Sequence, residues 1–232
     1  MKVIQWSAIL LLFILMGAGF GTADTLSDSM DQENWWNGTW ISEEYSITIF
    51  QNGSLIAGSY EPDDPMIRDP GMLKGTLSDD KRVFSGIWTE SGPFEVVLAE
   101  DNMSYSGTGG VKSDDSGDEA VTYSILRTRM GDISDPDNLW TGEWDNERGT
   151  QTMTQNGTIV TGSYIPYSLD EDEPGLIEGV VSDDGRELSA TWYEAGLFTF
   201  TISTDGLYFN GTYGTDLSDS AVFDSWNATK VI

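Results

Sequence analysis

Residues 36–60 read WNGTWISEEYSITIFQNGSLIAGSY, and residues 140–164 read WTGEWDNERGTQTMTQNGTIVTGSY. In both stretches apolar and polar residues alternate until an Asn-Gly pair interrupts the pattern. Alternation with a period of two predicts β-strands with one buried face. Asn-Gly tolerates the positive φ angles of a tight hairpin turn. The two stretches therefore predict the same β-hairpin twice, at an offset of 140 − 36 = 104 residues.

The repeat extends far beyond these two hairpins. At the same offset, residues 34–110 align with residues 138–214 without a gap, and 29 of the 77 positions are identical. Chance matching gives only a handful of identities, so the chain contains a duplication. After this region, a one-residue slip aligns Tyr123 with Trp226 and Arg127 with Lys230.

The duplication predicts how the chain is divided. We expect a signal peptide over 1–23, a disordered leader over 24–33, β-barrel repeats over 34–129 and 138–232, and a linker over 130–137. Lys2, the apolar run that follows it and the small residues Gly21 to Ala23 are typical of a cleaved secretory signal. An uncleaved anchor helix is the alternative. Each repeat is of ordinary domain size, so we expect each to fold alone.

Each copy predicts eight short strands. In the first copy they lie near 36–42, 45–51, 54–61, 72–78, 82–90, 93–99, 103–109 and 121–127. One face of these strands carries aromatic residues and glycines, and the other carries mostly hydroxyl groups. Consecutive strands joined by short turns favour an up-and-down barrel. The predicted fold class is all-β, with two tandem eight-stranded antiparallel up-and-down barrels after an N-terminal signal helix. A single barrel shared by both copies and a small sandwich are the alternatives.

The composition excludes several function classes. The chain has no His and no Cys, which excludes a Ser-His-Asp triad, a thiol nucleophile, disulfides and the usual zinc sites. A net charge of −28 disfavours nucleic acid and anionic membranes as partners. We also expect no transmembrane segment in the mature chain.

Two short stretches resemble a known family. Residues 38–46 followed by 58–60, and residues 142–150 followed by 162–164, resemble the opening strands of avidin-like biotin-binding barrels, and more broadly a lipocalin-like barrel. The resemblance implies ligand-binding roles for Ser42, Ser46 and Tyr60 in the first copy and for Asn146, Thr150 and Tyr164 in the second. It covers about 25 residues of each copy. Pro62 and Pro166 stand near the position of a ligand-binding Ser in that family, and a proline N cannot donate a hydrogen bond.

Acidic residues are concentrated in the loops at one end of each expected barrel. Asp63, Asp64, Asp170 and Asp172 are candidate ligands for Ca²⁺, which prefers oxygen ligands. A solvated acidic surface explains the same residues without a metal. We expect no other cofactor.

A second group of residues lies at the repeated Trp-x-Glu motif. Glu90 and Glu194 form a candidate carboxylate pair for glycoside hydrolysis, and each motif alternatively ends a strand before a turn marked by Gly92 or Gly196. Trp88 and Trp192 are candidate pocket residues, although rings at such positions more often form core.

Six Asn-x-Ser/Thr sequons are candidate glycosylation sites: Asn37, Asn52, Asn102, Asn156, Asn210 and Asn227. The Asn-Gly pairs among them are equally explained as turn residues. A signal peptide, strong acidity, many sequons and the absence of Cys are together typical of a secreted or cell-surface protein of a prokaryote, such as an archaeon.

The sequence favours a non-enzymatic binding or interaction module over an enzyme. The expected partner is a small molecule, a glycan or another surface protein. A carboxylate-dependent hydrolase, such as a glycosidase, and a structural, salt-adapted envelope protein are the alternatives.

Overall fold

The computed structural model describes residues 34–65, 68–110, 122–169, 173–217 and 223–232. The regular elements of these residues are all β-strands, and every strand pairing is antiparallel, which confirms the all-β prediction. The predicted signal peptide 1–23 and leader 24–33 lie outside the described residues. In the described part of the chain, no helix has the length and apolar character needed to cross a membrane.

Fourteen strands occur in the described residues, seven from each copy instead of the predicted eight. The first copy contributes β1 (Gly38–Ile41), β2 (Tyr45–Asn52), β3 (Leu55–Pro62), β4 (Gly71–Leu77), β5 (Val83–Leu98), β6 (Ser104–Gly110) and β7 (Thr122–Met130). The second contributes β8 (Gly142–Asp145), β9 (Gly149–Asn156), β10 (Ile159–Pro166), β11 (Gly175–Val181), β12 (Glu187–Ile202), β13 (Tyr208–Gly214) and β14 (Phe223–Lys230). Neighbours in sequence pair with one another, and β1 pairs with β14, so the ring of strands is closed.

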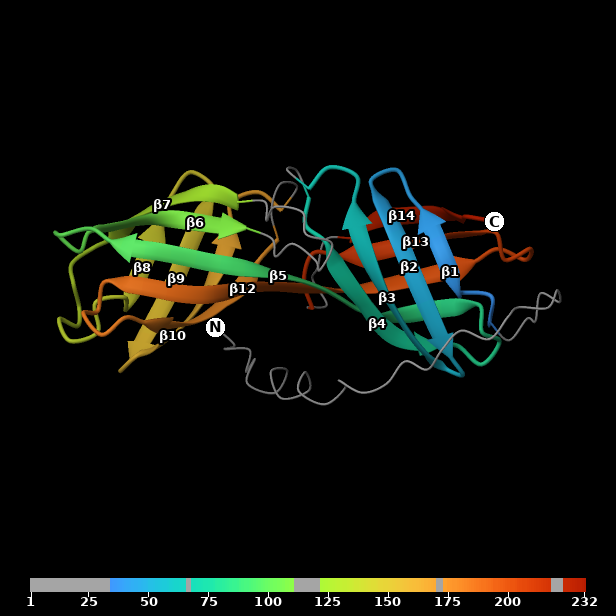
Figure 1. Ribbon diagram of the computed structural model, residues 1–232, viewed down its shortest axis with the longest axis horizontal. Coiled ribbons are helices and arrows are strands. Elements are labelled where there is room, and N and C mark those ends of the chain that lie inside the picture. The colour runs from blue at the N-terminus through green and yellow to red at the C-terminus, as the bar shows by residue number, and fades with distance from the viewer. Residues whose placement is uncertain (1–33, 66–67, 111–121, 170–172, 218–222) are drawn as a thin grey trace. The chain divides into compact units, whose positions relative to one another are not determined.

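The longest strands, β5 and β12, pair with each other across this ring (Figure 1). The sequence predicted a turn at Gly92 and at Gly196, and that prediction is wrong, because each strand continues through its glycine. Gly92 pairs with Trp192, and Gly196 pairs with Trp88. A Cβ atom at Gly92 would lie 1.7 Å from the Gly110 carbonyl oxygen and 2.6 Å from the Trp192 Nε1 atom. Glycine at each position therefore allows a backbone carbonyl group and a tryptophan indole to pack closely against the strand.

The β5–β12 pair divides the closed ring into two halves. Half A comprises the described residues of 36–90 and 196–230, and half B comprises the described residues of 92–130 and 139–194. The first parts of β5 and β12 lie in different halves, and so do their last parts. The prediction of two tandem barrels, each built from one copy, is not confirmed. An uninterrupted strand cannot reverse direction, so the last strands of each copy join the other half.

Each half has its own apolar core, and each core draws on both copies. The core of half A contains Trp36, Trp40, Ile47, Ile49, Ile56, Tyr60, Leu73, Leu77, Phe84, Trp88, Phe198, Phe200, Ile202, Phe209, Trp226 and Ala228. The core of half B contains Phe94, Val96, Leu98, Tyr105, Ile125, Trp140, Trp144, Met153, Val160, Ile177, Val181, Leu188, Ala190 and Trp192. The aromatic face of the sequence thus forms core, as the burial preferences of these rings predict.

Strand pairing also corrects the alignment of the two copies near their ends. Gly107 and Gly211 are equivalent, and they pair with Ile125 and Trp226. Trp226 is therefore the counterpart of Ile125, at an offset of 226 − 125 = 101 residues, and not of Tyr123. By the same register Lys230 is the counterpart of Arg129, and not of Arg127. The slip between the copies is three residues long, and in the sequence it falls between Gly110 and Thr122 in the first copy and between Gly214 and Phe223 in the second.

Candidate functional site

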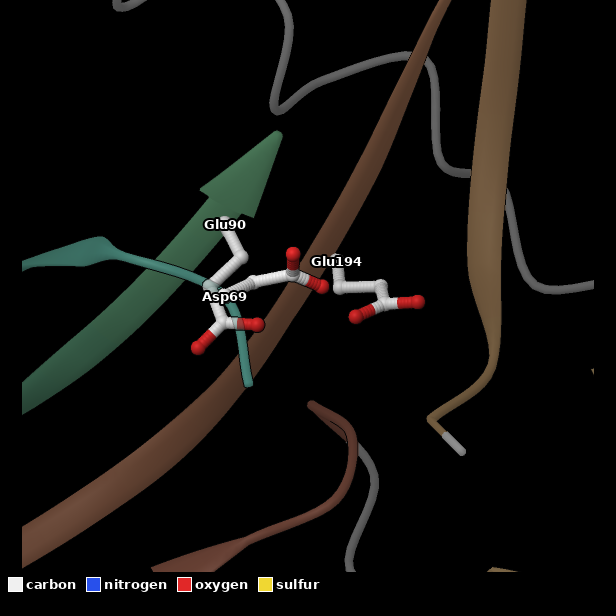
Figure 2. Close-up of side chains that lie close together, drawn as sticks. All are labelled: Asp69, Glu90 and Glu194. Atoms are coloured by element: carbon white, nitrogen blue, oxygen red, sulfur yellow. The ribbon is translucent and has the colours of Figure 1, made fainter. Parts of the chain in front are cut away.

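Glu90 and Glu194 are direct cross-strand partners at the centre of the β5–β12 pair. Glu90 and Glu194 are equivalent positions of the two copies. The Trp88–Gly196 pair is likewise equivalent to the Trp192–Gly92 pair. The two copies are therefore related by an approximate twofold axis that passes between the two glutamates. Figure 2 shows the Glu90 side chain extending from β5 towards Glu194 on β12.

Each glutamate accepts a hydrogen bond from a tyrosine of its own half of the site. The Tyr60 hydroxyl donates to the Glu90 carboxylate at 2.8 Å, and the Tyr164 hydroxyl donates to the Glu194 carboxylate. Burial raises the pKa of Glu90 well above its ordinary value, and the nearby charge of Glu194 raises it further. Burial, followed by the charge of Glu90, also raises the pKa of Tyr60. The site therefore favours a protonated Glu90 and neutral tyrosines.

A third carboxylate, from Asp69, reaches the pair from the segment before β4 (Figure 2). Single carboxylate oxygens of Asp69, Glu90 and Glu194 lie within 4.8 Å of one another. The sequence placed Asp69 among the acidic loop residues at the end that also holds Glu90, but did not select it as a site residue. A further signal exists, because Asp69 and Glu173 occupy the same repeat position before a Pro-Gly pair. Three oxygens are fewer than the six to eight that Ca²⁺ takes, so these residues alone do not complete a calcium site.

The carboxylates of Asp69, Glu90 and Glu194 border a cavity of about 1520 Å³, and residues of both halves line this cavity. Trp88 and Trp192 flank it, and their indole N–H groups donate to the Gly214 and Gly110 carbonyl oxygens at 2.8 Å and 2.9 Å. The cavity also borders three arginines, Arg68, Arg127 and Arg148. Its wall therefore combines hydrogen-bond acceptors, hydrogen-bond donors and aromatic rings.

The structure brings together some of the predicted ligand-binding residues. The cavity is lined by six of the eight predicted residues: Ser42, Tyr60, Trp88, Asn146, Tyr164 and Trp192. The other two do not belong to the lining: Ser46 lies on β2, and Thr150 lies on β9.

Ser42 and Asn146 have local hydrogen-bond partners. The Ser42 hydroxyl oxygen accepts the backbone N–H groups of Glu44 and Tyr45. The Asn146 Oδ1 atom accepts those of Arg148 and Gly149. Both side chains thus stabilise the turn that precedes the next strand.

Two of the four predicted calcium ligands, Asp63 and Asp64, lie in the described residues, and neither belongs to the carboxylate cluster. Asp63 and Asp64 are exposed after β3 and do not belong to the cavity lining. Asp170 and Asp172 lie outside the described residues. Calcium binding at these positions stays a prediction.

The sequons fall into two groups. Asn52, Asn156, Asn210 and Asn227 are exposed, whereas Asn37 and Asn102 are half-buried. The Asn37 Oδ1 atom accepts the backbone N–H of Gln51, and Asn102 adopts a positive φ of 59° in the turn before β6. The exposed four are therefore accessible for modification, and the other two have structural roles. Their glycosylation stays a prediction.

No family model, curated protein or solved structure matches this chain.

Proposed function

We propose that this protein is a non-enzymatic binding module whose cavity binds a small hydroxyl-rich molecule, such as a sugar. The observation that carries the proposal is the Glu90–Glu194 pair, which faces a cavity of about 1520 Å³ between two tryptophans. A ligand cavity typically combines apolar walls with a few convergent polar groups, and this cavity does so.

The residues that line the cavity favour a ligand with hydroxyl groups over a charged ligand. A hydroxyl can donate to a carboxylate such as Glu194 and accept from an arginine such as Arg127 or Arg148. An ammonium ion would meet these arginines, and an anion would meet three carboxylates within 4.8 Å of one another. The large negative charge of the chain adds to the repulsion of anions.

A carboxylate-dependent glycosidase is the second candidate, and the same pair supports it. A protonated carboxylic acid beside a second carboxylate is the arrangement that glycoside hydrolysis uses. The raised pKa of Glu90 would suit the general acid of such a pair.

A panel of 4-nitrophenyl glycosides separates the two candidates, because one compound reports both binding and cleavage. We expect calorimetry to detect binding of at least one glycoside while no nitrophenolate is released. The double variant Glu90→Gln with Glu194→Gln should lose this binding. The control Glu95→Gln changes an exposed residue of β5 and should bind as the wild type does.

Two outcomes would change the assignment. Release of nitrophenolate that disappears in the double variant would establish the glycosidase instead. Absence of both binding and cleavage across hexose, pentose and amino-sugar glycosides would contradict the sugar proposal.

A further inference from the structure

The cavity continues into half B but not into half A. Its lining includes Phe94, Gln151 and Ile177, which belong to the interior of half B. Their repeat counterparts in half A are Phe198, Ile47 and Leu73, and none of these borders the cavity. The two halves share one strand pattern, so their side chains must account for the difference.

Half A is closed at this end by a cluster of four aromatic rings. Ring centroids lie 5.3 Å apart for Tyr45 and Tyr60, 5.1 Å for Tyr60 and Trp226, 5.2 Å for Tyr45 and Trp226, and 5.6 Å for Tyr213 and Trp226. Three of these pairs are edge-to-face and the Tyr45–Trp226 pair is tilted, and such close packing leaves little space between the rings. The cluster therefore separates the interior of half A from the cavity.

Half B retains only one ring at the equivalent four positions. Tyr164 matches Tyr60, but Gly149, Ile125 and Gly109 replace Tyr45, Trp226 and Tyr213. The ring of Tyr123 lies over Gly109, but it is 46% exposed and does not reach the place of a buried tryptophan. The loss of two large rings and the reduction of a third position to Ile leave this end of half B open.

A polar group without a partner lies inside the opened half. Gln151 is 1% exposed, and its Oε1 atom accepts the Tyr105 hydroxyl at 2.7 Å. Its Nε2 atom has no hydrogen-bond partner within the described residues. Half A has Ile47 and Phe209 at the same two positions. A buried amide N–H without an acceptor is costly to a fold, so a ligand that supplies an acceptor to the Gln151 Nε2 atom would remove this cost.

Resting on the proposed function, we propose that half B contains a second part of the ligand site, which takes an uncharged ring carrying a carbonyl group. The ring would lie between Ile125, Ile177 and Trp192, and the carbonyl oxygen would accept a hydrogen bond from the Gln151 Nε2 atom. The carboxylates at the entrance exclude anionic rings. The full ligand would then have a hydroxyl-rich part at the glutamate pair and an apolar ring within half B.

Prodan, a neutral naphthalene ketone whose emission responds to hydrogen bonding at its carbonyl, is a suitable probe. Prodan lacks hydroxyl groups, so its binding does not require the glutamate pair. We expect saturable binding to the full chain with a stoichiometry of about one, since one half is open and the other closed.

Two variants test the site by giving half B the residues of half A. Ile125→Trp restores the missing ring and should weaken prodan binding by about tenfold or more, because it fills the pocket. The control Val97→Trp adds a ring on the outer face of β5, where Val97 is 48% exposed, and should leave binding unchanged.

The second variant, Tyr105→Phe with Gln151→Ile, copies the Phe209 and Ile47 pair and removes the donor. It should weaken binding by about fivefold, the value of one hydrogen bond, and shift the emission of bound prodan to the blue. Melting curves show whether each variant is folded.

The inference is overturned if prodan does not bind to the wild type. It is also overturned if the Ile125→Trp variant and the double variant are folded and both bind prodan as tightly as the wild type does. Failure of the glycosides to bind contradicts the proposed function and leaves the prodan result intact. Failure of prodan alone leaves the glutamate pair as a complete site.

Discussion

Arg129 and Lys230 occupy equivalent positions in the two halves, although the sequence repeat pairs Lys230 with Arg127. Each cation lies over a core tryptophan: the Arg129 Cζ atom is 4.1 Å from the centroid of Trp144, and the Lys230 Nζ atom is 5.2 Å from that of Trp40. Both cations thus make a cation–π contact with a core tryptophan. Strand register and these matching contacts show the equivalence, which the sequence alignment does not.

Replacement of Arg129 should cost stability. Its guanidinium donates to the carbonyl oxygens of Asn102, Thr141 and Leu139, and the residue is 5% exposed. Lysine cannot match this planar set of donors. We expect Arg129→Lys to lower the free energy of unfolding by about 1–3 kcal/mol, as for buried polar groups left without partners. Urea denaturation measures the change, and Arg127→Lys, at a half-buried position, is the control that should change less.

Separate expression of the two copies should fail to give folded monomers. The sequence predicts that residues 34–129 and 138–232 fold alone, but each core draws on both copies. A single copy would leave one edge of β5 or β12 without its partner strand. We expect either copy to be unfolded or to form a dimer by strand exchange, and a mixture of both copies to assemble. Light scattering and circular dichroism measure this, and a folded monomer of either copy would contradict the exchange of strands.

Substitution of Gly92 should destabilise the crossing of β5 and β12. Gly92→Ala would place a methyl group 1.7 Å from the Gly110 carbonyl oxygen, so the backbone must move. Overpacking of this kind costs about 1–3 kcal/mol. The neighbouring Ser91 is exposed, so Ser91→Ala is the matched control and should change the melting temperature little. A Gly92→Ala protein as stable as the wild type would show that the crossing can relax.

Stability should depend on pH through Glu90. Its pKa in the folded protein lies above the ordinary 4.5, so the folded state holds its proton more tightly than the unfolded state. This contribution is fully present below about pH 4.5 and is lost as the pH rises through the folded pKa. Glu90→Gln cannot ionise, so it should remove this loss and make the variant relatively more stable at neutral pH.

Comparison of denaturation curves between pH 4.5 and neutral pH isolates this effect. Glu194, Asp69 and Glu173 contribute charge to the same region in both proteins, so only the difference between Glu90→Gln and the wild type is informative. Equal pH dependence of the two proteins would show that Glu90 ionises normally.

Local pattern was sufficient to predict the β-strands, the hairpin turns and the core. Positive φ angles at Gly53 and Gly157 confirm the Asn-Gly turns, and alternation placed Trp40 and Trp144 on the buried face. These features depend on neighbouring residues, whose steric and burial preferences a sequence displays directly.

The site was only partly accessible to such reasoning. The repeat identified Glu90 and Glu194 as equivalent, and the structure makes them partners. Asp69 was expected only among the acidic loop residues and not as a site residue, because its approach to the pair depends on where the segment before β4 lies in space.

By itself the sequence determined the strands, the duplication and the aromatic face, because these follow from residue order and period. Only the tertiary structure decided which half each strand joins. A glycine at position 92 is compatible with a turn and with a close approach, and the difference rests on Trp192, which lies 100 residues away in the chain (192 − 92 = 100). Contacts over such distances depend on the packing of the whole chain, so the exchange of strands and the opening of half B could not be seen in the sequence.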